Sequence, residues 1–464
     1  MKQTVLPGID LSRRRPDPEE DAQWPSAAEL LTALAECDLP ATVPPPIPER
    51  DEERALFPLT ILGMGLSSTL LPAHREVLES STVLAAGQAL LARFAHMEAE
   101  KVPLRSPLQN AVELLLERRR NGARVTVLAD GDPLFFGIGA TLARRLSPEV
   151  LRILPGLSSL QEACARACLP WHDVRCVSLH GRGKYTELSV AALSGKPICL
   201  LTDDAATPDA IARFLLDRGV DWYSMHVFEN MHHEQESSCV CSLPEATQRC
   251  FGTVCTVLLI PGAPRRSPYL GISDTQLASE GGQFTKAPVR AAALAALRIR
   301  PADLVWDLGA GPGAVALEAC ALAYGGLVFA VERDAARVLC IEENRRRFGA
   351  ANLEIIAGNA PDCLRALPDP DTVFIGGGFG KPESAHSLVD VVCSRLKPGG
   401  RLAISCVLMG SLERCRALLH ALGWETRIRC IQVSETSSLG NDERLTALNP
   451  VFLISAVKHV EDER

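Results

Sequence analysis

The chain has 464 residues, which exceeds the size of a typical domain, so two or three domains are expected. Hydrophobic residues make up 47% of it, enough for complete cores, and no apolar run reaches the ~18 residues that span a bilayer. The formal net charge of −8 argues against nucleic acid as a bulk partner, because such binding usually leaves a basic footprint. An anionic small molecule held by a local group of arginines remains compatible with this charge.

Residues 1–7 lack the apolar segment of a signal peptide. The 16 cysteines are therefore expected to be reduced thiols in the cytoplasm, mostly acting as small buried hydrophobes. A zinc site near His232, His233, Cys239 and Cys241 is conceivable, but no second cysteine pair with ligand spacing follows. We expect no metal site and no membrane association.

Residues 1–56 are predicted to be an N-terminal extension that is partly flexible. Charged residues and prolines alternate over residues 13–20, and residues 44–46 are a stiff run of prolines. Residues 49–54 are mostly charged. Only 26–37 has helical spacing. We assign this region no chemistry.

A first α/β domain in two lobes is predicted over residues 57–262. Apolar strands at 59–62, 124–129 and 151–154 each run into a glycine turn, with a further strand at 83–86 and a helix at 110–120. Strands near 177, 198–201, 226–228 and 254–260 follow in the second half. Residues 263–270 are a linker by composition. A second domain is predicted over 271–464, with later strands at 352–356, 372–375, 401–407 and 450–457 completing a doubly wound sheet.

The second domain contains the most informative motif of the chain. An apolar run, 305–308, includes Asp307 and enters a loop with glycines at 309, 311 and 313. A helix-like stretch and a second apolar run then end at Glu332, about 20 residues beyond the loop, where an acid can accept hydrogen bonds from ribose hydroxyls. This pattern predicts a nucleoside-containing cofactor, and a tight strand-to-helix turn without a ligand is the alternative.

The motif also discriminates between cofactors. Its glycine spacing differs from the G-x-G-x-x-G pattern of nicotinamide sites. An acid at Asp307 can meet the cationic amino-acid end of S-adenosylmethionine, whereas it would repel a pyrophosphate. The motif therefore favours a methyltransferase over a dehydrogenase.

Several segments of the first domain together resemble the tetrapyrrole methylases, specifically the precorrin-7 carbon-5 methyltransferase branch. The matching segments are 63–65 (GMG), 131–139 (GDPLFFGIG), 155–159 (PGLSS), 171–173 (WHD), 178–182 (SLHGR), 201–203 (LTD) and 229–230 (EN). The chain departs from that family at 66–68, where Leu-Ser-Ser replaces the usual proline-glycine-aspartate turn, and at Asp130, where serine is usual.

The second domain resembles the decarboxylating precorrin-6B carbon-15 methyltransferases. Its matches are 271–274 (GISD), 281–286 (GGQFTK), 289–290 (VR), the Asp307 loop, 358–361 (GNAP), 374–377 (FIGG), 397–401 (KPGGR) and 449–452 (NPVF). The chain departs from the family pattern at 376–380 and 405–410. Both domains in this order resemble the fused precorrin-6Y C(5,15)-methyltransferases (decarboxylating) of cobalamin synthesis.

The resemblance implies a two-lobed tetrapyrrole methylase domain followed by a Rossmann-like class I methyltransferase domain, with S-adenosylmethionine as cofactor and a precorrin, with or without cobalt, as substrate. It implies a homo-oligomer as well. No catalytic residue is assigned, because the electron-rich meso carbon of the ring is itself the nucleophile. The residues expected to bind the cofactor are Asp307, Gly309, Gly311, Gly313, Glu332, Asn359, Ala360 and Thr285 in the second domain, and Gly63, Gly65, Asp132, Pro133, Gly137, Ser158 and Ser159 in the first.

Four basic residues are expected to bind the carboxylate arms of the ring, namely Lys286, Arg290, His180 and Arg182. Lys286 is equally readable as a surface lysine, Arg290 as a residue on a helix surface, and His180 as a loop histidine. Asp132 is also readable as a cap of its own turn.

Two other functions stay open. The second domain's sheet also resembles that of tRNA adenine methyltransferases, although the acidic balance and the lack of a long basic stripe weigh against tRNA. Alternatively, the first domain only docks the substrate, a reading that the Leu-Ser-Ser departure at 66–68 keeps open.

Overall fold

The computed structural model describes residues 57–66, 69–105, 107–179, 185–252, 255–282, 284–377 and 382–459. The chain divides into two compact units, residues 1–64 with 69–156 and residues 65–68 with 157–464. The division falls inside the range 57–262, at the point where the two lobes of the first domain are expected to meet.

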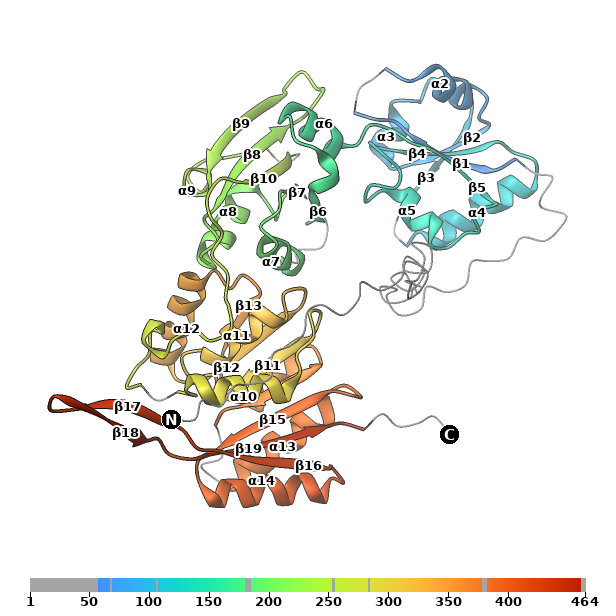
Figure 1. The fold of residues 1–464 in the computed structure, drawn as a ribbon. Helices are drawn as coiled ribbons and strands as arrows, with labels where there is room; N and C mark the ends of the chain where they lie inside the picture. The colour runs from blue at the N-terminus through green and yellow to red at the C-terminus, as the bar shows by residue number, and fades with distance from the viewer. Residues whose placement is uncertain are drawn as a thin grey trace, which may run out of the picture. The chain divides into compact units, whose positions relative to one another are not determined.

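The first unit is a parallel sheet covered on both faces (Figure 1). Its strand order is β3-β2-β4-β1-β5, and alternate strand residues enter two separate apolar clusters, Ile61 and Val127 in one and Leu62 and Leu128 in the other. Burial on both faces explains why these strands read as continuous apolar runs. The elements are β1 (Leu59–Gly63), α2 (Pro72–Glu79), β2 (Val83–Ala86), α3 (Gln88–Ala92), β3 (Glu100–Pro103), α4 (Gln109–Arg120), β4 (Val125–Ala129), α5 (Ile138–Ala143) and β5 (Leu151–Leu154).

The second unit begins with a mixed sheet of strand order β6-β7-β10-β8-β9, in which β6 and β7 are parallel and the remaining pairs are antiparallel. Trp222, Leu188 and Ile211 lie in its core. The elements are α6 (Ser159–Arg166), η2 (Trp171–Asp173), β6 (Arg175–Ser178), α7 (Thr186–Leu193), β7 (Ile198–Leu201), α8 (Pro208–Asp217), β8 (Tyr223–Glu229), β9 (Ser237–Ser242), α9 (Leu243–Ala246) and β10 (Cys255–Pro261).

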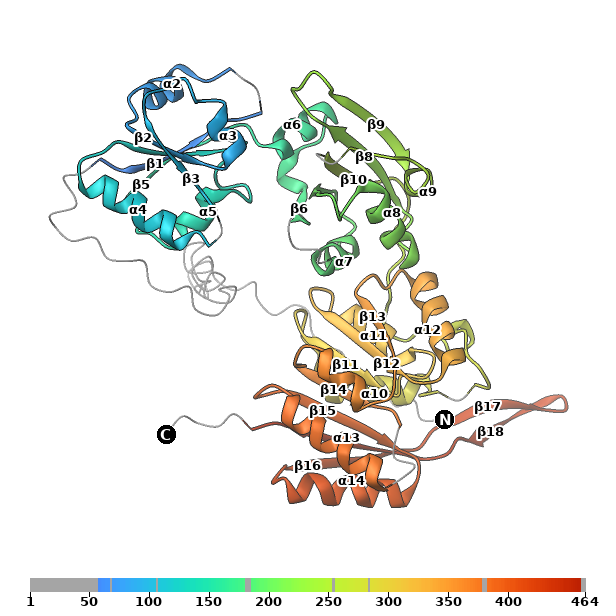
Figure 2. The same ribbon diagram turned by 180° about the vertical axis from the view of Figure 1, so that it is seen from behind.

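The second sheet of this unit is Rossmann-like, with strand order β13-β12-β11-β14-β15-β19-β16. The strands from β13 to β15 are parallel, and β19 pairs antiparallel with β15 and β16. Helices lie on both faces (Figures 1 and 2). The elements are η3 (Asp274–Gln276), α10 (Ala287–Leu297), β11 (Leu304–Leu308), α11 (Ala314–Leu322), β12 (Leu327–Glu332), α12 (Ala335–Phe348), β13 (Leu353–Ala357), η4 (Asp362–Ala366), β14 (Thr372–Ile375), α13 (Pro382–Arg395), β15 (Arg401–Cys406), α14 (Met409–Ala421), β16 (Thr426–Ile431) and β19 (Val451–Val457).

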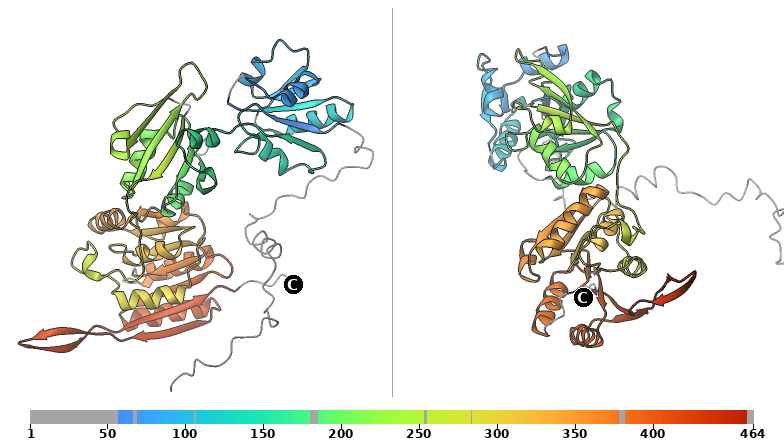
Figure 3. Two further views of the ribbon diagram at one scale, coloured as in Figure 1. Left: turned by 45° about the horizontal axis from the view of Figure 1, so that its top comes forward. Right: turned by 90° about the vertical axis from the view of Figure 1, so that its left-hand side faces the viewer.

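This arrangement confirms the predicted α/β class with parallel sheets. A two-stranded hairpin, β17 (Ser434–Leu439) and β18 (Asp442–Ala447), was not predicted and extends away from the second sheet (Figures 1 and 3). Within the part of the chain that the structure describes, no helix combines the length and apolarity that crossing a bilayer requires.

The two sheets of the second unit share a packed boundary. A Nη2 atom of Arg218 lies 2.8 Å from Oε1 of Glu354 on β13, and Arg218 is mostly buried. Gly219 lies so close to Arg346 that a Cβ atom would come within 2.1 Å of its carbonyl oxygen. Ala351 of the Rossmann-like part enters the apolar core around Trp222.

Candidate functional site

The glycine loop between β11 and α11 makes a tight turn in which several residues have left-handed backbone conformations. Gly309, Gly311 and Gly313 all have positive φ, at 71°, 58° and 81°. The amides of Gly309 and Ala310 donate to the carbonyl oxygen of Val331 at 3.0 and 3.1 Å. The loop is therefore held against the end of β12, as the predicted strand, turn, helix, strand pattern requires.

Asp307 is a buried carboxylate with one unused oxygen. The side chain is 1% exposed, and its Oδ2 accepts a hydrogen bond from the amide of Ala316 at 2.9 Å. Its Oδ1 has no hydrogen-bond partner among the described residues. The pKa of Asp307 is raised to about 7, mainly by burial, which outweighs the lowering effect of the Ala316 amide, with a smaller raising contribution from the charge of Glu332. Since an unpaired buried charge is costly, this site favours a cationic ligand.

Glu332, at the end of β12, lies directly beside the loop. Its Oε2 accepts from the amide of Gly311 at 2.8 Å, and its Oε1 accepts from Arg333 and Asp334 at 2.9 and 3.0 Å. These bonds fix the carboxylate while leaving lone pairs for further donors, such as ribose hydroxyls.

Asn359 and Ala360 follow the neighbouring strand, β13. The amide of Gly358 donates to the carbonyl oxygen of Glu332 at 2.9 Å, so this turn adjoins the end of β12. Asn359 is exposed and Ala360 is half-buried. The carboxyl ends of three adjacent parallel strands thus bring Asp307, Glu332 and Asn359 to one edge of the sheet, where open α/β folds bind ligands.

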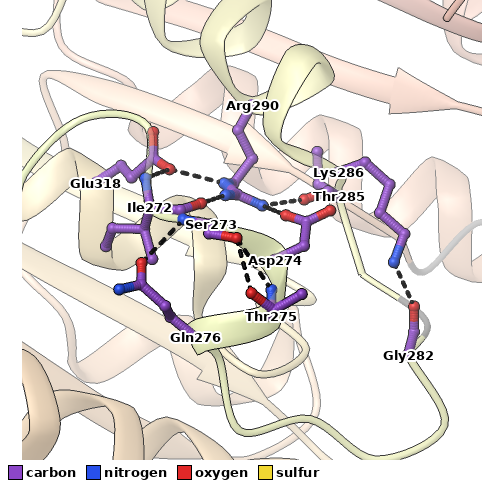
Figure 4. Close-up of polar contacts among 10 residues, drawn as sticks. All are labelled: Ile272, Ser273, Asp274, Thr275, Gln276, Gly282, Thr285, Lys286, Arg290 and Glu318. Carbon is purple, nitrogen blue, oxygen red and sulfur yellow. Dashed lines mark hydrogen bonds and ion pairs between the residues drawn. The ribbon is translucent and has the colours of Figure 1, made fainter. Parts of the chain in front are cut away.

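The segment before α10 carries Thr285 and Lys286 (Figure 4). The Lys286 ammonium donates to the carbonyl oxygen of Gly282 at 3.0 Å and lies 4.1 Å from the ring centroid of Phe284. It is half-buried and folded back on its own segment. The carbonyl oxygen of Thr285 accepts from Arg290 at 2.8 Å.

Arg290 is enclosed and each of its three guanidinium nitrogens donates a hydrogen bond within the protein, which does not support its expected contact with a substrate carboxylate (Figure 4). Its Nε donates to Oε1 of Glu318 at 2.9 Å, and its Nη1 donates to Oδ1 of Asp274 at 2.6 Å as well as to Thr285. Its Nη2 donates to the carbonyl oxygen of Ile272. The side chain is 0% exposed, so the alternative reading as a helix-surface residue is wrong.

Asp274 and Glu318, its two acidic partners, were not predicted. Glu318 also accepts from the amide of Ile272 at 3.1 Å, so one carboxylate on α11 fastens the segment that precedes η3. The signal that pointed to it was an acid inside an otherwise apolar helix.

In the first unit, Gly63, Asp132, Pro133 and Gly137 gather at the carboxyl ends of β1 and β4. A Cβ atom at Gly63 would come within 2.5 Å of the amide of Gly156 and 2.8 Å of Pro133 Cδ. Asp132 accepts from the amide of Leu134 at 2.8 Å and from Gly156 at 3.2 Å. Asp132 thus caps its own turn, as one reading held, and also ties that turn to the end of β5.

The remaining residues expected near the cofactor in the first domain fall in the second unit. Ser158 is the N-cap of α6, and its hydroxyl accepts from the amide of Gln161 at 3.2 Å and donates to the side chain of Gln161. This capping box occupies its hydroxyl proton. Ser159 is half-buried, and Gly65 has a φ of 65°. His180 and Arg182 lie outside the described residues.

Within the described ranges, no group of three or more His, Cys, Asp or Glu side chains is arranged to hold a metal ion. His232, one of the residues that a zinc site could include, instead has its Nε2 atom 3.1 Å from Oε1 of Glu162. The described cysteines are free thiols.

Both halves of the chain are similar to known protein families. Residues 59–247 match the model of the tetrapyrrole (corrin/porphyrin) methylases, and 276–458 match that of the precorrin methyltransferase domain. A cobalt-precorrin-6B C(15)-methyltransferase (decarboxylating) of Salmonella typhimurium is 37% identical over 40% of this chain and 96% of its own. A cobalt-precorrin-7 C(5)-methyltransferase of the same organism is 34% identical over 38% of this chain and 87% of its own.

One relative covers both halves at once. The precorrin-6Y C(5,15)-methyltransferase [decarboxylating] of Sinorhizobium sp is 32% identical over 75% of this chain and 84% of its own length. With both domains present in that order, this chain belongs to the family of the precorrin-6Y C(5,15)-methyltransferases (decarboxylating).

Proposed function

We propose that the Rossmann-like domain binds S-adenosylmethionine over the carboxyl ends of β11, β12 and β13. The observation that carries this proposal is the partnerless, buried Oδ1 of Asp307, which the ammonium group of the cofactor would satisfy. The loop of Gly309, Gly311 and Gly313 would cradle the donor, with Glu332 at the ribose. Asn359 and Ala360 would flank the adenine, and Thr285 would close over it.

The first domain would hold a second molecule of the same cofactor. Gly63, Pro133 and Gly137 shape its site, since a Cβ atom at either glycine would meet backbone or Pro133 closer than 3 Å. Asp132 fixes the turn that carries them. Gly65, Ser158 and Ser159 are the other proposed contacts.

The proposed substrates follow from the relatives' activities. The second domain would methylate carbon 15 of precorrin-6B, or of its cobalt form, and the first would methylate carbon 5 of precorrin-7. When bound, S-adenosylmethionine supplies a methyl group on a sulfonium that is already a good leaving group. The chain's own residues therefore have to align the acceptor carbon, and such positioning lowers a barrier by several kcal/mol.

Decarboxylation makes a different demand on the second domain. Loss of carbon dioxide from the ring C acetate leaves an electron pair, which the conjugated macrocycle can accept. The protein has to hold that arm with its breaking bond aligned to the ring π system. Lys286 is the proposed cation for a ring carboxylate, and His180 and Arg182 are the corresponding proposal for the first domain.

The test is a mass-resolved assay with purified protein, S-adenosylmethionine, and precorrin-6B and its cobalt form in parallel. We expect a gain of two methyl groups and a loss of one carbon dioxide, and the ring that reacts identifies the physiological substrate. One methyl with decarboxylation would mean that the first domain only docks the substrate. No change on either ring, or nanomolar tRNA binding at moderate salt, would overturn the proposal.

Two variants separate the domains in that assay. Asp307→Asn should stop the carbon-15 methylation and decarboxylation, while Asp132→Ala should spare both of these and stop the carbon-5 step. Because the carbon-5 step acts on precorrin-7, which the second domain would produce, Asp307→Asn is also supplied with precorrin-7 and should still methylate it. Loss of the carbon-15 step in Asp132→Ala, or of precorrin-7 methylation in Asp307→Asn, would contradict the assignment of one reaction to each domain. Light scattering measures the homo-oligomer that we also propose, and fractionation of producing cells measures the proposed cytoplasmic location.

A further inference from the structure

The carboxyl edge of the Rossmann-like sheet has a second half that the proposed cofactor contacts leave free. The strand order β13-β12-β11-β14-β15 means that the chain reverses its direction of winding between β11 and β14. Asp307, Glu332 and Asn359 all lie on the β11 to β13 half. A methyl acceptor must approach the donor within about 3.5 Å. The ends of β14 and β15 are the part of this edge that those contacts leave for it.

The turn that follows β14 lies beside the glycine loop. The amide of Gly376 donates to the carbonyl oxygen of Leu308 at 2.9 Å, which keeps this turn beside the glycine loop. A Cβ atom built on Gly309 would meet the amide of Gly377 at 3.3 Å, so the two turns touch. Among the described residues, a Cβ atom built on Gly377 would meet nothing within 4 Å.

The next strand in the sheet, β15, is followed directly by three residues with exposed apolar side chains. Val407, Leu408 and Met409 are 53%, 69% and 56% exposed, although they directly follow a buried strand. Consecutive large apolar side chains on the surface carry a cost in water that a ligand can remove. We refer to these three residues as the apolar platform.

A cation lies toward the same edge. The Nε of Arg401, at the start of β15, donates to the carbonyl oxygen of Leu297 at 3.0 Å, and α10 packs on β15. The last residue of α10 therefore lies at the beginning of β15. Lys286 directly precedes the opposite end of this helix.

We infer that the apolar platform of Val407, Leu408 and Met409 receives one face of the tetrapyrrole macrocycle, with Lys286 at its rim for a carboxylate arm. A conjugated ring with anionic arms is apolar on its faces and charged at its periphery, and this edge has the same distribution. The inference rests on the proposed carbon-15 reaction and adds the residues that select a large flat acceptor.

The double variant Leu408→Ser, Met409→Gln tests this without threatening the fold. Leu408 is the N-cap of α14 and provides no side-chain cap, so serine there should stabilise the helix, and glutamine is a good helix former. We expect the KM for precorrin-6B to rise about tenfold, which corresponds to about 1.4 kcal/mol of lost binding. Affinity for S-adenosylmethionine and the carbon-5 step should not change.

Leu422→Ser is the matched control, because Leu422 lies at the other end of α14 and is 46% exposed. It should leave the KM unchanged. An unchanged KM in the double variant, or an equal loss of cofactor affinity, would overturn the inference. So would an altered oligomeric state with normal kinetics, which would mark the platform as a contact between copies. A wild-type protein without carbon-15 activity would instead refute the proposed function.

Discussion

The Nε atom of Arg290 on α10 donates to Oε1 of Glu318 on α11 across 2.9 Å, and both side chains are closed to solvent. The same guanidinium also holds the carbonyl oxygens of Ile272 and Thr285. A single ion pair therefore fastens both ends of the segment that precedes α10 to the helix that follows the glycine loop.

Removing the cation from this pair should be strongly destabilising. Arg290→Met leaves the carboxylate of Glu318 buried without its charged partner, a change that typically costs about 3–5 kcal/mol. Urea unfolding should show an earlier midpoint at unchanged slope. The control is Arg213→Ala, whose partner Asp209 forms a surface pair and whose side chain is 53% exposed, so its loss should cost less than about 1 kcal/mol. Equal losses in both variants would contradict this account.

The central strands could be predicted because they are buried on both faces. The observed β14, Thr372–Ile375, coincides with the predicted 372–375, and β11 and β12 end at the acids and glycines that marked them. An apolar run bounded by glycine or an acid is a strong signal when no solvent-facing residues interrupt it.

The edge elements carry no such signal. The hairpin of β17 and β18 is almost entirely exposed, and most of its residues, such as Ser437 and Glu443, are polar. The edge strand β16 is also largely exposed. Without a buried face there is no apolar periodicity to read, so these strands were missed.

The residues of the candidate site also divide into those that the sequence predicts and those that it does not. The backbone loop and its acids could be predicted because they are local in sequence. The burial of Arg290 could not, because its partners Asp274 and Glu318 lie 16 and 28 residues away and meet it only through the packing of α10 on α11. A basic residue on a helix is usually solvated, and nothing in the spacing indicated otherwise.

The buried carboxyl of Asp307 should make the stability of the chain depend on pH. Its pKa rises from an ordinary 3.8 to about 7, mainly through burial, so between these values the folded chain keeps a proton that the unfolded chain has lost. Its contribution to stability therefore falls as pH rises from about 4 to 7, by up to about 4 kcal/mol. Asp307→Asn cannot ionise, so it should exceed the wild type in unfolding free energy by more at pH 8 than at pH 5. A difference independent of pH would contradict this prediction.

The same group should control the affinity for S-adenosylmethionine. The ammonium of the cofactor needs an ionised Asp307, so binding by the wild type should weaken below pH 7, approaching tenfold per unit. Calorimetric titration at pH 6, 7 and 8 measures this, and Asp307→Asn should bind weakly without that dependence. Glu332 contributes to the raised pKa of Asp307, so Glu332→Gln should shift the profile toward acid. An Asp307→Asn variant with wild-type affinity would exclude the proposed contact.

Gly313 should tolerate no side chain, for two reasons that a control can separate. Its φ is 81°, in the left-handed region, and a Cβ atom would lie 3.1 Å from Cγ2 of Ile341. Gly271 has the same φ of 81° with nothing within 4 Å, so Gly271→Ala measures the backbone strain alone, about 1–2 kcal/mol.

Gly313→Ala should cost more than Gly271→Ala in unfolding free energy, because the side chain of Ile341 on α12 would have to give way to the new Cβ atom. It should also weaken binding of S-adenosylmethionine, which Gly271→Ala should not affect. A double-mutant cycle with Ile341→Ala isolates the crowding, and we expect the two substitutions together to cost less than the sum of each alone. Additive costs would mean that backbone strain, and not the contact with Ile341, requires glycine at this position.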